Sequence, residues 1–139
     1  SEAYDQAVGY IQKRKSGDIK SIKTPWQKFN EVSMDGLEWN SLTVIAGRPG
    51  SGKTLIGSMI SREAFRLNPE QNFCVLDFQF EMLARSIALR EISGSTGINV
   101  RRLSSVGGIA STEDIDSAIK YCNENRHREI YTYERPLDV

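Results

Sequence analysis

The chain has 139 residues, which is enough for one hydrophobic core. Its 18 basic and 18 acidic residues give a formal net charge of zero, so no overall basic field points to nucleic acid or to a membrane surface. The 2 cysteines, Cys74 and Cys122, lack metal-ligand spacing and are expected to be buried small hydrophobes. The sequence shows no signal-peptide pattern and no apolar run of about 18 residues, which argues against secretion and a membrane span and predicts a cytoplasmic protein.

Residues 2–16 have the apolar periodicity of an amphipathic helix. Its apolar side chains share one face: Tyr4, Val8 and Ile11. Residues 17–23 form the expected connector, and residues 24–139 form the expected main domain. The sequence begins at Ser1 directly with helical pattern, which we interpret as part of a longer protein. A helix at the end of a connector either folds back on its own domain or docks on a neighbour, and the sequence leaves both open.

The segment after the connector is expected to start a second helix. Pro25 suits the first turn of a helix, and Thr24 suits its N-cap. Three aromatic or branched side chains would share one face of that helix as packing anchors: Trp26, Phe29 and Val32. Residues 34–41 predict a loop that leads into the first strand.

A glycine-rich segment lies between an apolar run, residues 42–46, which predicts the first strand, and a helical pattern, residues 55–67. It matches the G-x-x-x-x-G-K-[ST] spacing of phosphate-binding loops. Glycines allow successive backbone amides to converge on an anion, and a helix N-terminus adds unpaired amides and a positive dipole. Lys53 can reach the β- and γ-phosphates, and the Thr54 hydroxyl can ligate Mg²⁺. The expected contacts to a nucleoside triphosphate are Gly47, Arg48, Pro49, Gly50, Ser51, Gly52, Lys53, Thr54 and Leu55.

Residues 73–80 predict a second strand whose two faces differ. Asp77, Gln79 and Glu81 follow one another on one face, which predicts that this face borders a site, because a fully buried parallel strand is apolar on both faces. Ligands of open α/β sheets lie beyond the carboxyl ends of the strands, so Glu81 can orient and deprotonate a water that attacks the γ-phosphate. Alternatively, Glu81 is an acid at the N-terminus of the next helix, expected from about Met82. The spacing alone does not separate these interpretations.

The remaining chain continues the alternation of helices and strands. The helix from about Met82 is expected to end at one of the next glycines, and residues 99–104 form a short turn. Residues 111–114 have capping-box character and open a further helix. Residues 130–133 form the expected third strand. His127 lies in a charged turn and is expected to be exposed and not to bind a metal.

The order of these segments resembles the ATPase domain of DnaB-like replicative helicases, which belongs to the RecA-like phosphate-loop class. The phosphate loop is generic, but Arg48-Pro49 inside it, combined with residues 78–82 (Phe-Gln-Phe-Glu-Met), is more particular. Further segments fall where the family has similar residues: 24–30, 36–37, 42–49, 98–103 and 130–131. The resemblance implies an α/β fold with a mainly parallel sheet flanked by helices, which the sequence follows as far as the third strand. Residues 24–139 would then be a partial ATPase domain.

The resemblance also implies a function. It points to an ATP-dependent DNA helicase that uses Mg²⁺, moves along single-stranded DNA and forms a hexameric ring, with primase or a loader as partners, in a bacterial or phage-infected cytoplasm. It favours Glu81 as the catalytic base beside Lys53, and residues 2–16 as a linker helix that docks on the next subunit. Three positions depart from the family pattern, at Pro25, Gln79 and Leu83.

The family's remaining functional residues are expected beyond residue 139. These are the acid that holds Mg²⁺ through water, the phosphate sensor, the arginine finger and the loops that grip DNA. This stretch alone is therefore expected to be inactive. Two other functions remain as alternatives, a non-catalytic ring-assembly or loader module and a small phosphate-loop kinase.

Overall fold

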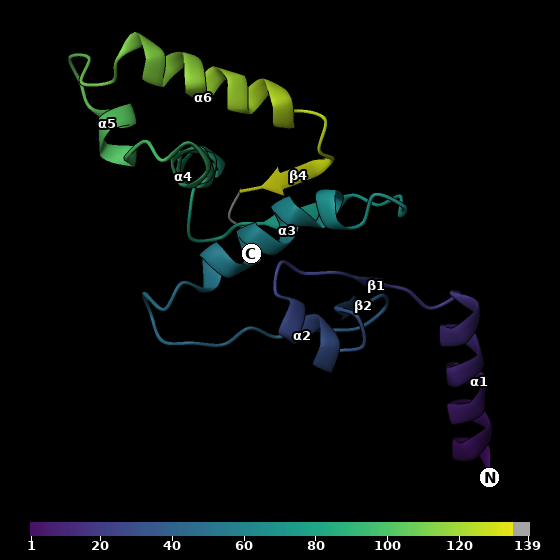
Figure 1. Ribbon diagram of the computed structural model, residues 1–139. Coiled ribbons are helices and arrows are strands. Elements are labelled where there is room, and N and C mark those ends of the chain that lie inside the picture. The colour runs from purple at the N-terminus through teal and green to yellow at the C-terminus, as the bar shows by residue number, and fades with distance from the viewer. Residues whose placement is uncertain (135–139) are drawn as a thin grey trace. The chain divides into compact units, whose positions relative to one another are not determined.

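The computed structural model describes residues 1–134, so residues 135–139 of the expected main domain lie outside the described part (Figure 1). The chain divides into two compact units, Ser1–Gln71 and Asn72–Val139. Helices and short strands occur in both units, so the protein belongs to the α/β class. Among the described residues, no helix is both long enough and apolar enough to cross a membrane.

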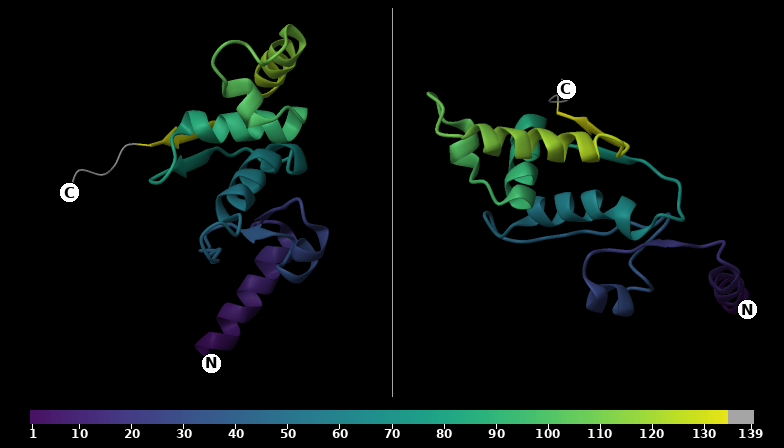
Figure 2. Two further views of the ribbon diagram at one scale, coloured as in Figure 1. Left: turned by 90° about the vertical axis from the view of Figure 1, so that its left-hand side faces the viewer. Right: turned by 45° about the horizontal axis from the view of Figure 1, so that its top comes forward.

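The first unit contains three helices and a short antiparallel ribbon. The elements, in chain order, are α1 (Glu2–Ser16), β1 (Ser21–Ile22), α2 (Gln27–Val32), β2 (Leu37–Glu38) and α3 (Lys53–Leu67). Strand β1 pairs with β2, with Ser21 opposite Glu38 and Ile22 opposite Leu37. Helix α1 has the predicted bounds and ends at Gly17, whose φ of 83° is left-handed. In the left view of Figure 2, α1 extends away from the ribbon toward its N-terminus.

Helix α2 begins later than predicted. Its first residue is Gln27 and its N-cap is Trp26, so the expectation of Thr24 as cap and Pro25 in the first turn is wrong. The Thr24 hydroxyl donates to the Asn30 side-chain oxygen at 2.7 Å, and the Asn30 amide donates back to the Thr24 carbonyl at 2.8 Å. These bonds hold Thr24 beside the helix, and its oxygen accepts the Trp26 amide only at 3.4 Å.

Two of the three expected anchors of α2 do contact an apolar space. Trp26 and Phe29 line a cavity of about 520 Å³ together with Ile45, Ile56 and other apolar residues of the first unit. Val32 is exposed, so the prediction that it is an anchor is wrong. The most buried apolar residue of the described chain is Ala64 of α3, and Ile56 and Ile60 of the same helix line the cavity. The apolar interior of the first unit therefore lies along this face of α3.

The segment before the phosphate loop is not a regular strand. Residues 42–46 were expected to form the first strand, and no such strand is present among the described residues. Leu42 is 90% exposed and Val44 is 77% exposed. A strand requires a hydrogen-bonded neighbour, and the described strand pairings join only β1 to β2 and β3 to β4.

The second unit is a parallel strand pair connected by helices. Its elements are β3 (Val75–Phe78), α4 (Ala84–Thr96), α5 (Val100–Ser104), α6 (Thr112–Asn125) and β4 (Ile130–Tyr133). Strand β4 has the predicted bounds, whereas β3 is shorter than residues 73–80 and α4 starts two positions after Met82. Helix α4 packs against α5 and α6 (Figure 1). The register pairs Val75 with Ile130 and Phe78 with Tyr133.

Local signals in this unit are largely confirmed. Ser111 and Asp114 form the expected capping box, with the Asp114 amide donating to the Ser111 hydroxyl at 3.1 Å and the Ser111 amide donating to the Asp114 carboxylate at 2.9 Å. Residues 99–104, expected as a turn, instead contain the short helix α5, capped by the side chain of Asn99. His127 is exposed as predicted. Cys74 is also exposed, so its predicted burial is wrong.

Candidate phosphate-binding site

Residues 47–52 form a tight loop at the N-terminus of α3. The Ser51 amide donates to the Arg48 carbonyl at 3.1 Å and closes a turn. Gly50 and Gly52 have φ values of 76° and 90°, in the left-handed region that a Cβ disfavours. Glycine at these two positions, of which Gly52 is the second glycine of the motif, therefore permits the backbone path that leads into the helix.

The loop also closes on itself at its first glycine. A Cβ on Gly47 would lie 2.5 Å from the Ser51 hydroxyl oxygen, closer than packed atoms approach. Only glycine therefore fits at this position without displacing Ser51. Gly47, at the start of the loop, and Ser51, near its end, therefore lie close together.

Lys53 is the first residue of α3, and its side chain folds back over the loop. Its ammonium donates to the Gly47 carbonyl at 3.0 Å and to the Arg48 carbonyl at 3.1 Å. Both bonds are exposed to solvent, and residues 47–51 are exposed throughout. The positive charge of Lys53 is thus held at the loop, where phosphate oxygens can replace the two carbonyl acceptors.

The N-terminus of α3 supplies further donors. A helix provides no internal acceptor for the amides of its first turn, here those of Lys53, Thr54 and Leu55. The N-cap is Gly52, which has no side chain to accept them. The helix has 15 residues, so its dipole adds a positive end at the same place. Amides, dipole and ammonium therefore lie together at one end of α3, and such a combination of donors and positive charge suits an anion.

The donor set also fits Mg²⁺ held together with phosphate. Thr54 is half-buried in the first turn of α3, and its hydroxyl is the kind of hard oxygen ligand that Mg²⁺ accepts. Within residues 1–134, no group of three His, Cys, Asp or Glu side chains forms a metal cage.

Glu81 lies in the second unit, between the end of β3 and the start of α4. Its carboxylate is exposed and makes no hydrogen bond or ion pair within the described residues. The N-terminus of α4 uses another acid, because the Ala84 amide donates to the carboxylate of Glu134. Glu81 precedes the first helical residue, so the structure gives it no capping role.

The polar face of β3 carries one internal contact. The Gln79 side-chain amide donates to the Asp77 carboxylate at 2.6 Å. Along the strand, Val75 and Asp77 are half-buried, whereas Leu76 and Phe78 on the apolar face are exposed. The polar face is therefore the better covered of the two within the described structure.

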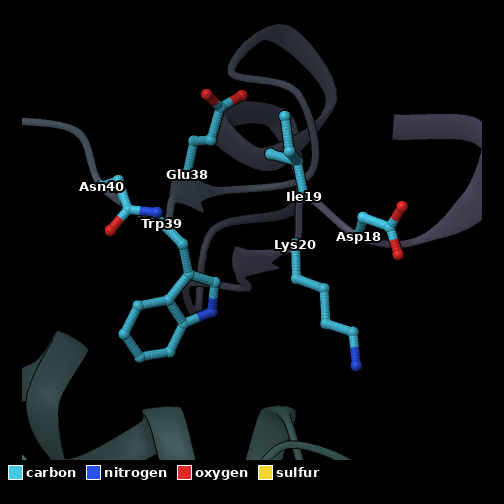
Figure 3. A pocket seen from close by; sticks show the side chains of 6 residues that line it. All are labelled: Asp18, Ile19, Lys20, Glu38, Trp39 and Asn40. Atoms are coloured by element: carbon cyan, nitrogen blue, oxygen red, sulfur yellow. The ribbon is translucent and has the colours of Figure 1, made fainter. Parts of the chain in front are cut away.

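A second cavity of the first unit lies at the ribbon, away from the phosphate loop in sequence. It has a volume of about 410 Å³ and is lined by Asp18, Ile19, Lys20, Glu38, Trp39 and Asn40. Figure 3 shows the Trp39 ring and the Lys20 side chain extending to the same side of the ribbon. The Trp39 indole donates to the Gln71 side-chain oxygen at 2.9 Å. This cavity therefore adjoins the contact between the ribbon and the chain that follows α3.

The sequence did not reveal that contact. Asn68 directly follows α3, and its side chain binds the connector, 45 positions earlier in the sequence. Gln71 and Arg14 likewise carry long-range hydrogen bonds that no local pattern indicates. The one available signal was an amide side chain at a helix end, which is also the usual signature of a simple helix stop.

The loop, the lysine folded across it and the helix that follows define an α/β protein of the phosphate-loop class. The sequence itself places the chain more narrowly. Residues 21–137 match the family described as DnaB-like helicase C terminal domain, and the chain belongs to that family. Helix α1 precedes the matched residues.

A curated relative is similar over nearly the whole chain. The replicative DNA helicase DnaB of Helicobacter pylori is 27% identical over 137 residues, which cover 96% of this chain. The same residues cover 27% of that relative, so the chain spans about a quarter of its length.

Proposed function

We propose that this chain is the nucleotide-binding portion of a ring-shaped replicative helicase that hydrolyses ATP with Mg²⁺ to move along single-stranded DNA. The observation that supports it best is the Lys53 ammonium, held at 3.0 and 3.1 Å from two loop carbonyls at a helix N-terminus, in a chain of this helicase family. The fold proposed for the complete domain is RecA-like, with a mainly parallel sheet. The proposed location is the bacterial or phage-infected cytoplasm.

In this proposal the loop binds the triphosphate. The amides of residues 50–54 surround the β-phosphate, and Arg48 and Pro49 complete the loop, with the Arg48 carbonyl accepting the Ser51 amide. Lys53 exchanges its two carbonyl acceptors for oxygens of the β- and γ-phosphates, so its charge acts where negative charge develops during transfer. Thr54 supplies the hydroxyl ligand for Mg²⁺, and the ion neutralises the phosphate oxygens.

Glu81 is the proposed general base. Its carboxylate is exposed, and among residues 1–134 no cation or amide engages it, so it is available to a water molecule. The competing structural role, an acid at the start of α4, falls to Glu134. In the proposed mechanism Glu81 orients the attacking water and accepts its proton.

Helix α1 is the proposed docking element. Tyr4, Val8 and Ile11 are all exposed, so the apolar face of the helix has no partner within the described chain. We take residues 2–16 as the docking helix, residues 17–23 as its connector and residues 24–139 as the ATPase portion. The proposed partner is the next copy of the same protein in a hexameric ring, with primase or a loader as further partners. If deletion of residues 1–16 from the complete protein left the ring intact by light scattering, this role would be wrong.

The catalytic assignment is tested by the substitution Glu81→Gln in the complete protein. The amide keeps the size of the side chain but cannot accept a proton, so we expect ATP to bind normally while hydrolysis stops. Glu70→Gln, on an exposed residue outside the loop, is the matched control and should retain both. Equal loss of binding and turnover in Glu81→Gln would contradict the assignment.

A second measurement separates a motor from a nucleotide-binding loader. ATP hydrolysis by the complete protein is measured with and without single-stranded DNA. We expect DNA to stimulate hydrolysis, because translocation couples the two. Nucleotide binding without hydrolysis, in either condition, would favour the non-catalytic function.

A further inference from the structure

Asn68, directly after α3, has the best-buried side chain of the described residues, with 1% of its surface exposed. Its side-chain oxygen accepts the Lys23 amide at 2.8 Å, and its side-chain nitrogen donates to the Lys23 carbonyl at 3.2 Å. The same nitrogen donates to the Ala64 carbonyl of α3 at 2.8 Å. One side chain therefore satisfies both backbone groups of Lys23 and ties them to the last turn of the helix.

This pattern is specific to asparagine. Its oxygen faces a donor and its nitrogen faces two acceptors, so the amide orientation is fixed by its partners. Aspartate has no donor for the two carbonyls, and glutamine is longer by one methylene. The contact fixes the position of the connector along α3, because a shift by one residue would leave buried polar groups without partners.

Gln71 makes a second contact of the same kind. Its side-chain nitrogen donates to the Ser21 carbonyl at 2.9 Å, and its oxygen accepts the Trp39 indole at 2.9 Å. The buried polar residues of the described chain are Ser21, Thr24 and Asn68, and all three lie where the connector meets the end of α3. The connector is therefore attached to the end of α3 more firmly than a loose tether would be.

The connector is attached to α1 from its other side. Arg14 of α1 donates to the Met34 carbonyl at 2.6 Å and to the Ser21 hydroxyl at 3.1 Å. Tyr10 of α1 donates to the carboxylate of Glu38 in β2. Direct hydrogen bonds thus run from α1 through the β1–β2 ribbon to Asn68 and Gln71. Helix α3, about 22 Å long at 1.5 Å per residue, joins that junction to the phosphate loop.

We propose that Asn68 is a positioning residue, which holds the connector on α3 so that α1 and the phosphate-loop helix move as one body. The inference rests on the proposed function, in which α1 docks on another copy and the loop binds ATP. Docking that displaces α1 then displaces α3, and the two binding events influence each other's affinity to the same extent. Asn68 contacts neither ATP nor the neighbouring copy, so it acts only through the elements it joins.

The test uses the complete protein and a non-hydrolysable ATP analogue. Affinity for the analogue is measured at protein concentrations below and above assembly, with assembly followed by sedimentation. We expect wild-type affinity to change by at least about fivefold on assembly, and this ratio to fall to about one in Asn68→Ala. Hydrogen exchange should show a faster Lys23 amide in the same variant. Asn123→Ala, an exposed asparagine on α6, is the control and should keep the wild-type ratio.

Two further variants keep the test decisive. If Asn68→Ala does not fold, the same ratio is measured in Gln71→Ala. This substitution removes the neighbouring contact to the connector, and Gln71 is less buried than Asn68. Val8→Asp, on the exposed face of α1, should weaken assembly. If it does so while Asn68→Ala and Gln71→Ala retain the wild-type ratio, the positioning role is wrong and the docking function stands. If Val8→Asp leaves assembly unchanged, the docking function and the inference both fail.

Discussion

Removal of the Lys53 ammonium is the most direct perturbation of the phosphate loop. The ammonium donates to the Gly47 and Arg48 carbonyls at 3.0 and 3.1 Å. Binding of a triphosphate requires it to leave these acceptors for phosphate oxygens. The effect of Lys53→Ala on affinity is therefore the difference between the attraction gained and the two hydrogen bonds lost.

Both contributions can be estimated. Two unit charges about 4 Å apart attract by about 4 kcal/mol at an effective dielectric constant of about 20. Each hydrogen bond given up contributes about 1 kcal/mol, so about 2 kcal/mol is lost for the pair. The net contribution of Lys53 to binding is about 2 kcal/mol, which corresponds to about 30-fold in Kd. The loss in turnover should be larger, because more negative charge faces Lys53 in the transition state.

The assay is titration of the complete protein with a fluorescent ATP analogue, followed by anisotropy. Lys28→Ala removes an exposed lysine of α2 and serves as the control, with Kd unchanged. Lys53→Arg keeps the charge but replaces a compact ammonium by a planar fork, so it should bind more weakly than wild type. A Kd for Lys53→Ala within twofold of wild type would refute the assigned position of the ammonium at the phosphates.

Three further predictions concern the stability of individual elements in the two units. Gly52→Ala should lower the free energy of unfolding by about 1–2 kcal/mol because its φ of 90° is left-handed. Gly57→Ala, within α3 with open space for a Cβ, should instead stabilise by about 0.5–1 kcal/mol; thermal unfolding that ranks the two the other way would contradict this. The hydrogen bond from the Ser111 amide, with the Arg102 charge beside it, holds the pKa of Asp114 below its usual value. The capping box should therefore stabilise α6 fully above about pH 4 and lose this contribution as the pH falls through the lower pKa of the folded state. Asp114→Asn should reduce the loss of stability at acid pH, and an unchanged dependence of the free energy of unfolding on pH would count against the assignment. Arg14→Ala removes three hydrogen bonds and should destabilise the attachment of α1 by about 3 kcal/mol, which faster hydrogen exchange in residues 10–16 would report.

Features set by neighbouring residues were predictable. The bounds of α1, the helix after the phosphate loop, the Ser111 capping box and β4 follow from periodicity, glycine positions and capping chemistry. The donors of the loop itself were also predictable, because they are backbone amides and a lysine within one turn of each other. Such features depend on interactions between residues a few positions apart, which the order of residues specifies directly.

Features that depend on residues far apart in the sequence were not predictable. Residues 42–46 have the composition of a strand, but pairing depends on a neighbour that local sequence does not choose. Cys74 was expected inside and lies at the surface. The acid at the start of α4 is Glu134, 50 positions away from the amide that it binds, and no spacing rule points to it.

The phosphate loop could be located without coordinates, because its glycines, its lysine and the start of the following helix lie within eight consecutive positions, 47–54. The partners of the residues at the two ends of α3 became known only from the folded structure. At one end Lys53 closes over the loop, and at the other Asn68 holds the connector of α1. A buried amide finds its partners by proximity in space, and Asn68 and Lys23 become neighbours only once the chain has folded.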